Sequence, residues 1–252
     1  MASRNKPLRV LVIGGYGFFG RRIAQLLAGN EAIQLLIGGR DLQKAQRQAL
    51  ALVLAAEQGV MLDVATDITS TLQRLQVDVV IHTAGPFQQQ RYTVAEAAIA
   101  AGVHYIDLAD GREFVAGIQV LDERARAAGV LVTSGASSLP ALSSAVVDQY
   151  LPRFRLLTAI RCGIASGARA PGLATMQGVF GYCGNRYGAW LAVPGPMCRA
   201  GSIPSSIAFR PRSAGAFWVP ATFPTWYCFP DVTASRQPPS MPALPACRGI
   251  CR

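Results

Sequence analysis

Residues 10–22 read VLVIGGYGFFGRR, so three glycines at a G-x-G-x-x-G spacing lie between an apolar run and a helical pattern. In this context the motif is typical of Rossmann domains that bind dinucleotides. The first glycine permits a tight turn, the second lets backbone approach the pyrophosphate, and the third lets the helix pack closely. Free N–H groups at the helix start then bind phosphate. The residues expected at the cofactor here are Gly15, Tyr16, Gly17, Phe18, Phe19 and Gly20.

Apolar runs alternate with stretches of helical period through the first half of the chain, as in repeated βαβ units. The runs lack polar alternation, which indicates strands buried on both faces. We therefore predict an α/β fold, a doubly wound parallel Rossmann sheet followed by an incomplete or irregular second region. Strands are expected at 8–13, 33–38, 60–64, 78–84, 104–109 and 130–135, with a further one at 157–165. Helices are expected near 41–57, 92–101 and 119–128.

Two helices carry local signals for their ends and faces. The helix after the glycine motif is expected to turn Ile23, Leu26 and Leu27 toward the sheet and to end at Gly29. Asp41 is placed to cap the next helix.

The end of the second strand indicates the cofactor. An acid about 20 residues after the motif would hold the adenosine ribose of NAD. Here the chain reads Gly38-Gly39-Arg40. Two glycines leave space and an arginine supplies a planar donor fork for a 2′-phosphate, so NADP is predicted in preference to NAD. The alternative is a solvated Arg40 at a loop edge.

The ends of the third and fourth strands supply further candidates. The fourth strand ends in TAGPF (83–87), which in Rossmann order lies beside the first strand, at the crevice where ligands bind. Phe87 either walls the nicotinamide pocket or belongs to the core. Asp63 either meets the adenine side or caps a loop. The cofactor-binding residues predicted here are Asp63, Ala84, Gly85, Pro86 and Phe87.

The catalytic residues stay unknown. His104, Tyr105, Asp107 and Asp110 surround the fifth strand and are residue types that donate protons. Strand alternation puts Tyr105 and Asp107 on one face and His104 on the other, so the group does not converge and structural roles are favoured. His82 is expected to be a buried histidine with satisfied hydrogen bonds.

Composition removes several classes of protein. The net charge is +10, yet the basic residues form no dense cluster, so no nucleic-acid partner is predicted. The only lysines are Lys6 and Lys44, which excludes a Tyr-x-x-x-Lys pair and a Walker lysine. No metal site is expected, because Cys247 and Cys251 lack a second pair. Since no apolar run approaches about 20 residues and no cleavage site follows the first, we expect no membrane association and a cytoplasmic location.

The chain changes character after about residue 176. Eleven of the 16 prolines and all three tryptophans follow, and periodic patterns fade. Two interpretations stand, an irregular second domain and a tail that is frame-altered or truncated. The predicted organisation is a Rossmann domain at 1–135, the start of an α+β substrate domain at 136–184, and a Pro/Arg-rich irregular tail at 185–252.

Four segments together resemble the saccharopine dehydrogenase-like oxidoreductases: VLVIGGYGFFGRRIA, DVVIHTAGPF, AEAAIAAGVHYIDLADG and VTSGASSLPALSSAVVD. The resemblance covers roughly residues 8–180. It implies an NADP-binding Rossmann domain followed by an α+β substrate domain. The catalytic lysines of the lysine-pathway enzymes have no counterpart here.

Two functions follow as hypotheses. The first is an NADP-dependent oxidoreductase that transfers hydride to or from an unidentified small substrate. The alternative is a non-catalytic NADP-binding or redox-sensing module, or a truncated product that keeps only the cofactor fold. A homodimer is left open.

Overall fold

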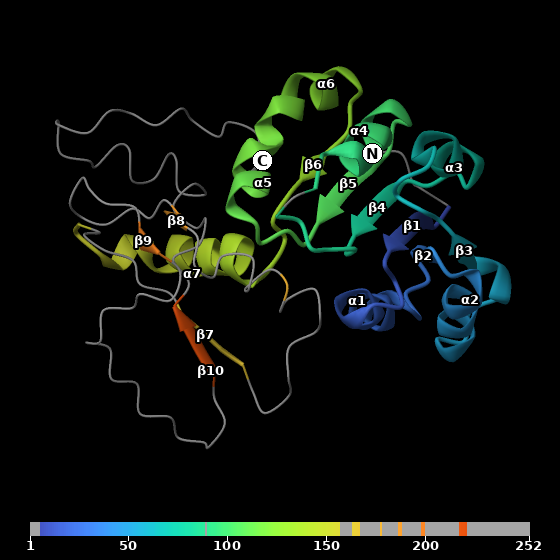
Figure 1. The fold of residues 1–252 in the computed structure, drawn as a ribbon, viewed down its shortest axis with the longest axis horizontal. Coiled ribbons are helices and arrows are strands. Elements are labelled where there is room, and N and C mark those ends of the chain that lie inside the picture. Colours follow the sequence, from blue (N-terminus) through green and yellow to red (C-terminus); the bar gives the residue numbers. More distant parts are fainter. Residues whose placement is uncertain are drawn as a thin grey trace.

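A computed structural model of the protein describes residues 6–88 and 90–156, with the short segments 163–166, 177, 186–187, 198–199 and 217–220. Its main sheet has six parallel strands in the order β3-β2-β1-β4-β5-β6 (Figure 1). This is the Rossmann order, which confirms the predicted fold class. The strands are β1 (Leu8–Ile13), β2 (Ile33–Gly39), β3 (Gly59–Met61), β4 (Val79–His82), β5 (His104–Asp107) and β6 (Val132–Thr133).

Helices cover both faces of this sheet. The helices after β1 and β2, α1 and α2, pack on one face through small residues such as Ala24, Ala45 and Ala49. The remaining connections, which include α3, α4 and α6, lie on the other face. Their bounds are α1 (Phe18–Leu27), α2 (Leu42–Ala51), η1 (Ala56–Gln58), α3 (Ile68–Arg74), α4 (Thr93–Ala100), α5 (Arg112–Gly117), η2 (Ile118–Leu121) and α6 (Asp122–Ala127).

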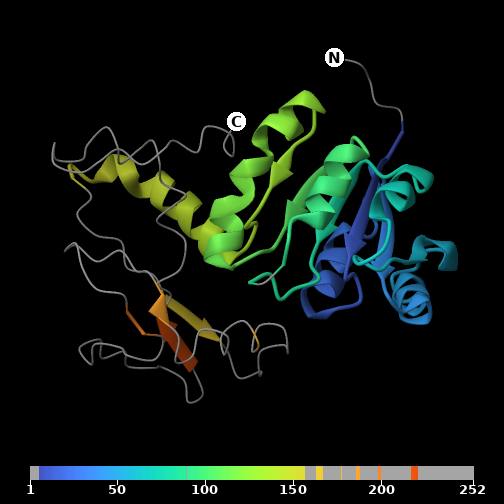
Figure 2. The ribbon, with the colours of Figure 1, turned by 45° about the horizontal axis from the view of Figure 1, so that its top comes forward.

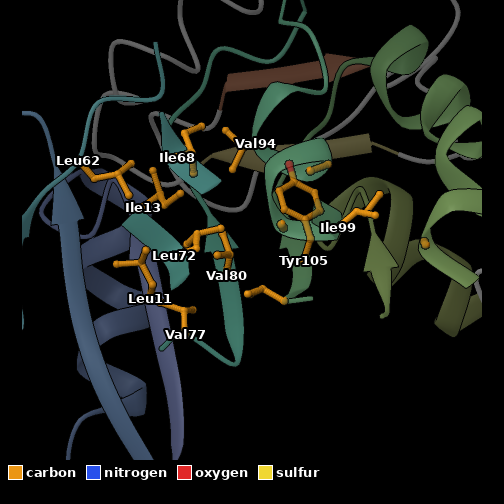
Figure 3. Packing of buried hydrophobic residues seen from close by; sticks show 14 of the residues in the cluster. Leu11, Ile13, Leu62, Ile68, Leu72, Val77, Val80, Val94, Ile99 and Tyr105 are labelled. Atoms are coloured by element: carbon orange, nitrogen blue, oxygen red, sulfur yellow. The ribbon is translucent and has the colours of Figure 1, made fainter. Parts of the chain in front are cut away.

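The larger hydrophobic cluster lies between the sheet and α3 and α4 (Figure 3). Leu11, Val80 and Tyr105 from three adjacent strands meet Leu72 from α3 and Ile99 from α4. Burying such side chains contributes roughly 1.5–3 kcal/mol each to folding. The cluster therefore fixes the strand positions whose carboxyl ends carry the candidate site.

The chain after β6 begins with η3 (Ser138–Leu142), α7 (Ser143–Tyr150) and η4 (Leu151–Arg153). Figure 2 shows α7, in yellow, extending away from the parallel sheet. No residue of α7 is buried against the described residues. Beyond it, β7 (Gly163–Ser166) pairs antiparallel with β10 (Phe217–Pro220), and β8 (Arg186–Tyr187) pairs with β9 (Cys198–Arg199).

Several expected element bounds change. The helix predicted to reach residue 57 ends at Ala51, and the third strand is only three residues long. Leu26 is 83% exposed, so its predicted burial is wrong. The buried residues of α1 are Gly20 and Ala24, and this face leaves Leu26 on the solvent side.

The predictions for the chain after residue 156 can be compared with only a few described residues. Of the strand expected at 157–165, residues 163–165 lie in β7, and 157–162 fall outside the described part. Most of the region 185–252 also falls outside it. No described helix has the length and apolar character needed to cross a membrane. Within the described residues no three His, Cys, Asp or Glu side chains gather as metal ligands would.

Candidate functional site

The glycine loop makes its tight turn at Gly14, one residue earlier than predicted. Gly14 has φ +79°, in the left-handed region that favours glycine. The N–H groups of Gly14 and Gly15 donate to the Gly38 carbonyl at 2.8 and 3.1 Å, which anchors the loop to β2. Gly17 N–H donates to the Gly14 carbonyl at 2.8 Å and closes the turn. Gly15 lies against β2 instead, since a Cβ there would be 2.9 Å from Ile37.

Helix α1, which follows the loop, packs so closely against it that only glycine fits at residue 20. A Cβ on Gly20 would lie 2.1 Å from the Gly14 carbonyl oxygen and 2.6 Å from Thr83 Oγ1. Only glycine fits there without displacing backbone. The close-packing role predicted for Gly20 therefore agrees with its surroundings.

The start of α1 has no side-chain cap. Its N-cap is Gly17, whereas the N-caps of α2 and α3 are Asp41 and Asp67, whose carboxylates accept from backbone N–H groups. The first three N–H groups of α1, at residues 18–20, have no acceptor among the described residues. They present partial positive charge at the carboxyl edge of the sheet. This arrangement fits a pyrophosphate.

Next to this helix start, Phe18 and Phe19 are 38% and 46% exposed and pack edge to face. The Arg22 guanidinium lies 4.1 Å from the Phe18 ring centre. Their side chains therefore remain accessible beside the free N–H groups.

Tyr16 links the glycine loop to the end of β2. Its hydroxyl accepts from Asp41 N–H at 3.1 Å, and a Cβ on Gly39 would lie 2.3 Å from its ring. The space expected at Gly38 and Gly39 for a 2′-phosphate is thus filled by Leu11 and Tyr16 side chains.

Arg40 itself is exposed and has no ion-pair or hydrogen-bond partner in the described part of the chain. Asp41 accepts from Lys44 N–H at 3.0 Å, so its predicted capping role is confirmed.

Asp63 makes a local turn. Its carboxylate accepts from Ala65 N–H at 3.0 Å, and its carbonyl accepts from the Thr66 N–H and hydroxyl. Of the two predicted alternatives, this contact favours the loop cap.

The loop after β4 lies beside the glycine loop, as Rossmann order requires. Ala84 and Gly85 are half-buried and Pro86 is exposed. Phe87 is only 5% exposed and packs against His82 and Phe114, with ring centres 5.1 and 5.4 Å apart. Burial therefore favours the core alternative for Phe87.

A buried polar chain crosses β4, β5 and the loop after β6. Tyr105 hydroxyl donates to Asp107 Oδ2 at 3.0 Å, and Asp107 Oδ1 also accepts from Ala109 N–H, Ser134 hydroxyl and Gly135 N–H, each at 2.9 Å. Burial raises the pKa of Asp107 against the lowering effect of these donors. Burial also raises the pKa of Tyr105.

His82 lies at the end of this row of hydrogen-bonded side chains. Its Nδ1 lies 3.1 Å from the Tyr105 oxygen, and because that hydroxyl donates to Asp107, Nδ1 is the protonated nitrogen. Nε2 is buried without a partner among the described residues, so the expectation of a fully satisfied histidine is wrong. Burial lowers the pKa of His82 to about 4.

The other two proton-donor candidates, His104 and Asp110, form their hydrogen bonds with residues outside this row of side chains. His104 Nδ1 accepts from Leu131 N–H at 2.9 Å, and Asp110 accepts from Gln88 at 3.1 Å. Only Tyr105 and Asp107 come together, as strand alternation predicted.

Sequence reasoning missed the role of Gly14 in the turn, for which the doublet Gly14-Gly15 was a signal. It placed Thr83 at the crevice with the rest of TAGPF but did not predict its contacts with the glycine loop.

Comparisons with known proteins agree with this geometry. Residues 10–134 match the family described as the saccharopine dehydrogenase NADP binding domain. The human saccharopine dehydrogenase-like oxidoreductase is 28% identical over 159 residues, which is 56% of this chain and 37% of that protein. A Mycobacterium tuberculosis protein, provisionally named a trans-acting enoyl reductase, is 30% identical over 112 residues, 43% of this chain and 26% of its own length.

The solved structure of Saccharomyces cerevisiae saccharopine dehydrogenase (L-Glu forming) shares the fold. Its TM-score is 0.50 at 21% identity, over 65% of this chain and 36% of that one. This chain thus spans between about a quarter and two fifths of the length of these three relatives. The matched part contains the glycine loop, Arg40 and the whole parallel sheet except its first two residues. Residues 10–134 therefore belong to the saccharopine dehydrogenase family's NADP-binding domain, and the cofactor of this domain is NADP.

Proposed function

We propose that the protein is an NADP-dependent oxidoreductase whose cofactor lies across the carboxyl edge of the sheet, from β2 to β4. The observation that carries this proposal is the uncapped start of α1 together with the exposed Arg40 at the end of β2, because the N–H groups of residues 18–20 and the Arg40 guanidinium have no partner among the described residues. A dinucleotide with a 2′-phosphate has anionic groups that suit both features.

The binding residues divide by part of the cofactor. Gly15, Gly17 and Gly20, with Tyr16 and the exposed Phe18 and Phe19, surround the pyrophosphate. Arg40 binds the 2′-phosphate, with its backbone neighbour Asp41 held by Tyr16. Ala84, Gly85 and Pro86 border the nicotinamide above the buried Phe87.

The bound cofactor supplies the hydride chemistry, and the chain supplies binding and orientation. The carboxyl edge of β4 is the place where a substrate meets the nicotinamide in a Rossmann fold. We assign residues 1–135 to cofactor binding and 136–184 to the start of a substrate domain. In this proposal the substrate is a small molecule, the first segment binds the cofactor and the second begins the domain that binds the substrate.

Calorimetry with NADPH and NADH tests the proposal on wild type, Arg40→Ala and Arg74→Ala. Losing a charge-assisted hydrogen bond costs roughly 1.5–3 kcal/mol, so Arg40→Ala is expected to weaken NADPH binding by about 10- to 150-fold and NADH binding little. Arg74 is an exposed arginine in the last turn of α3, so its loss is the matched charge control.

Wild-type protein that binds neither nucleotide would overturn the proposed function. Equal weakening of NADPH and NADH by Arg40→Ala would overturn the 2′-phosphate role alone. If binding holds, NADPH oxidation with a panel of imines, ketones and enoyl compounds tests turnover, and its absence would favour a non-catalytic NADP-binding module.

A further inference from the structure

Thr83, which follows β4, connects two loops through one hydroxyl. Thr83 Oγ1 lies 2.8 Å from the Ile13 carbonyl oxygen and 3.3 Å from the Gly14 carbonyl oxygen, so its single proton is shared between them in a bifurcated hydrogen bond whose shorter branch goes to Ile13. Thr83 N–H also donates to the Ile13 carbonyl, at 2.9 Å. The residue therefore binds the last carbonyl of β1 and the first carbonyl of the glycine loop.

The hydroxyl occupies the space that the missing side chains of the loop leave. A Cβ on Gly14 would lie 2.9 Å from Thr83 Oγ1, and a Cβ on Gly20 would lie 2.6 Å from it. The hydroxyl is thus enclosed by the turn on one side and by α1 on the other. Two of the loop's glycines leave room for Thr83 as well as for neighbouring backbone.

The Gly14 carbonyl decides how the turn is closed. It accepts from Gly17 N–H at 2.8 Å, and Gly17 is the residue from which α1 starts. The Thr83 hydroxyl is a second donor to this carbonyl, at 3.3 Å, and a second donor restrains the rotation of the carbonyl. The restrained carbonyl in turn fixes where the free N–H groups of residues 18–20 point.

We propose that Thr83 is a positioning residue for NADP, whose hydroxyl holds the glycine loop in the conformation that receives the pyrophosphate. This inference rests on the proposed cofactor site. It adds a side chain from the loop directly after β4, one that acts through the Gly14 carbonyl and is not proposed to touch the cofactor. It predicts an effect confined to the pyrophosphate end of the nucleotide.

The test measures dissociation constants for NADPH and for adenosine 2′-monophosphate, a fragment that has the 2′-phosphate and lacks the pyrophosphate. Thr83→Val removes the hydroxyl at constant size, and Thr83→Ala removes it without placing a methyl group near Gly20. A single hydrogen bond corresponds to about a three- to tenfold change in affinity, so both variants are expected to bind NADPH that much more weakly. Their binding of the fragment is expected to stay within about twofold.

Thr83→Ser keeps the hydroxyl and is expected to restore NADPH affinity to within about twofold of wild type. Circular dichroism shows whether each variant is folded. Unchanged NADPH affinity in Thr83→Ala, equal weakening of NADPH and the fragment, or no rescue by serine would each overturn the inference. Wild-type protein that fails to bind NADPH would instead overturn the proposed function, so the two failures are distinguishable.

Discussion

Acid destabilises this domain through the buried imidazole of His82. The side chain is 1% exposed, and burial lowers its pKa from 6.5 to about 4. The unfolded chain therefore binds a proton at a pH where the folded chain does not. The stability associated with neutral His82 is complete above pH 6.5 and is lost as the pH falls toward 4.

The magnitude follows from the two pKa values. One pKa unit corresponds to 1.36 kcal/mol, so complete protonation costs about 3 kcal/mol and acidification from pH 7.5 to 5 costs about 2 kcal/mol. Urea unfolding followed by far-ultraviolet circular dichroism measures this loss directly. His82→Asn is the matched variant, because its amide nitrogen can still donate toward Tyr105 while nothing at the position titrates.

Asp107 titrates in both proteins, so the difference between wild type and variant reports His82. We expect the wild type to lose about 2 kcal/mol more than His82→Asn between pH 7.5 and 5. Equal losses in the two proteins would refute the reasoning, because they would show that the histidine has the same pKa folded and unfolded.

Two further predictions concern buried contacts. Asp107→Ala leaves the Tyr105 hydroxyl and three other donors without an acceptor, and we expect it to lower the free energy of unfolding by roughly 3–5 kcal/mol. Asp107→Asn is expected to cost less, because the amide keeps one acceptor oxygen and removes the buried charge. Equal losses for the two variants in urea unfolding would contradict this. Gly39→Ala pushes a methyl group into the Tyr16 ring and is expected to cost roughly 1–3 kcal/mol and weaken NADPH binding. In a Tyr16→Ala background, the loss of stability caused by Gly39→Ala in thermal melts should disappear. An equal loss of stability in both backgrounds would show that the added methyl group does not clash with Tyr16.

The sheet was predictable because its signals are local. The glycine motif and the continuous apolar runs identify each βαβ unit, and the strand order follows from the rules for such units. The face of α1 was not predictable in the same way. Leu26 fits a helical period, but the close approach at Gly20 decides which face meets the sheet, and it leaves Leu26 exposed.

The site shows the same division between local and tertiary information. Strand alternation correctly placed Tyr105 and Asp107 on one face. It could not connect them to His82, because that contact depends on the register that pairs His82 with Asp107 across β4 and β5. Phe87 also had two readings in the sequence, since an apolar ring suits a pocket wall and a core equally, and only its burial distinguishes them.

Because of the contact between Tyr16 and the end of β2, the backbone conformation near residue 40 does not depend on the charged side chain at that residue. The Tyr16 ring fills the space above Gly39 and its hydroxyl holds Asp41 N–H, so the backbone around residue 40 is fixed by the loop itself. The side chain at residue 40 takes no part in that scaffold. Redesign of cofactor preference can therefore begin with one exchange, Arg40→Asp, that replaces the cation proposed to bind the 2′-phosphate with an acid suited to the ribose, on unchanged backbone.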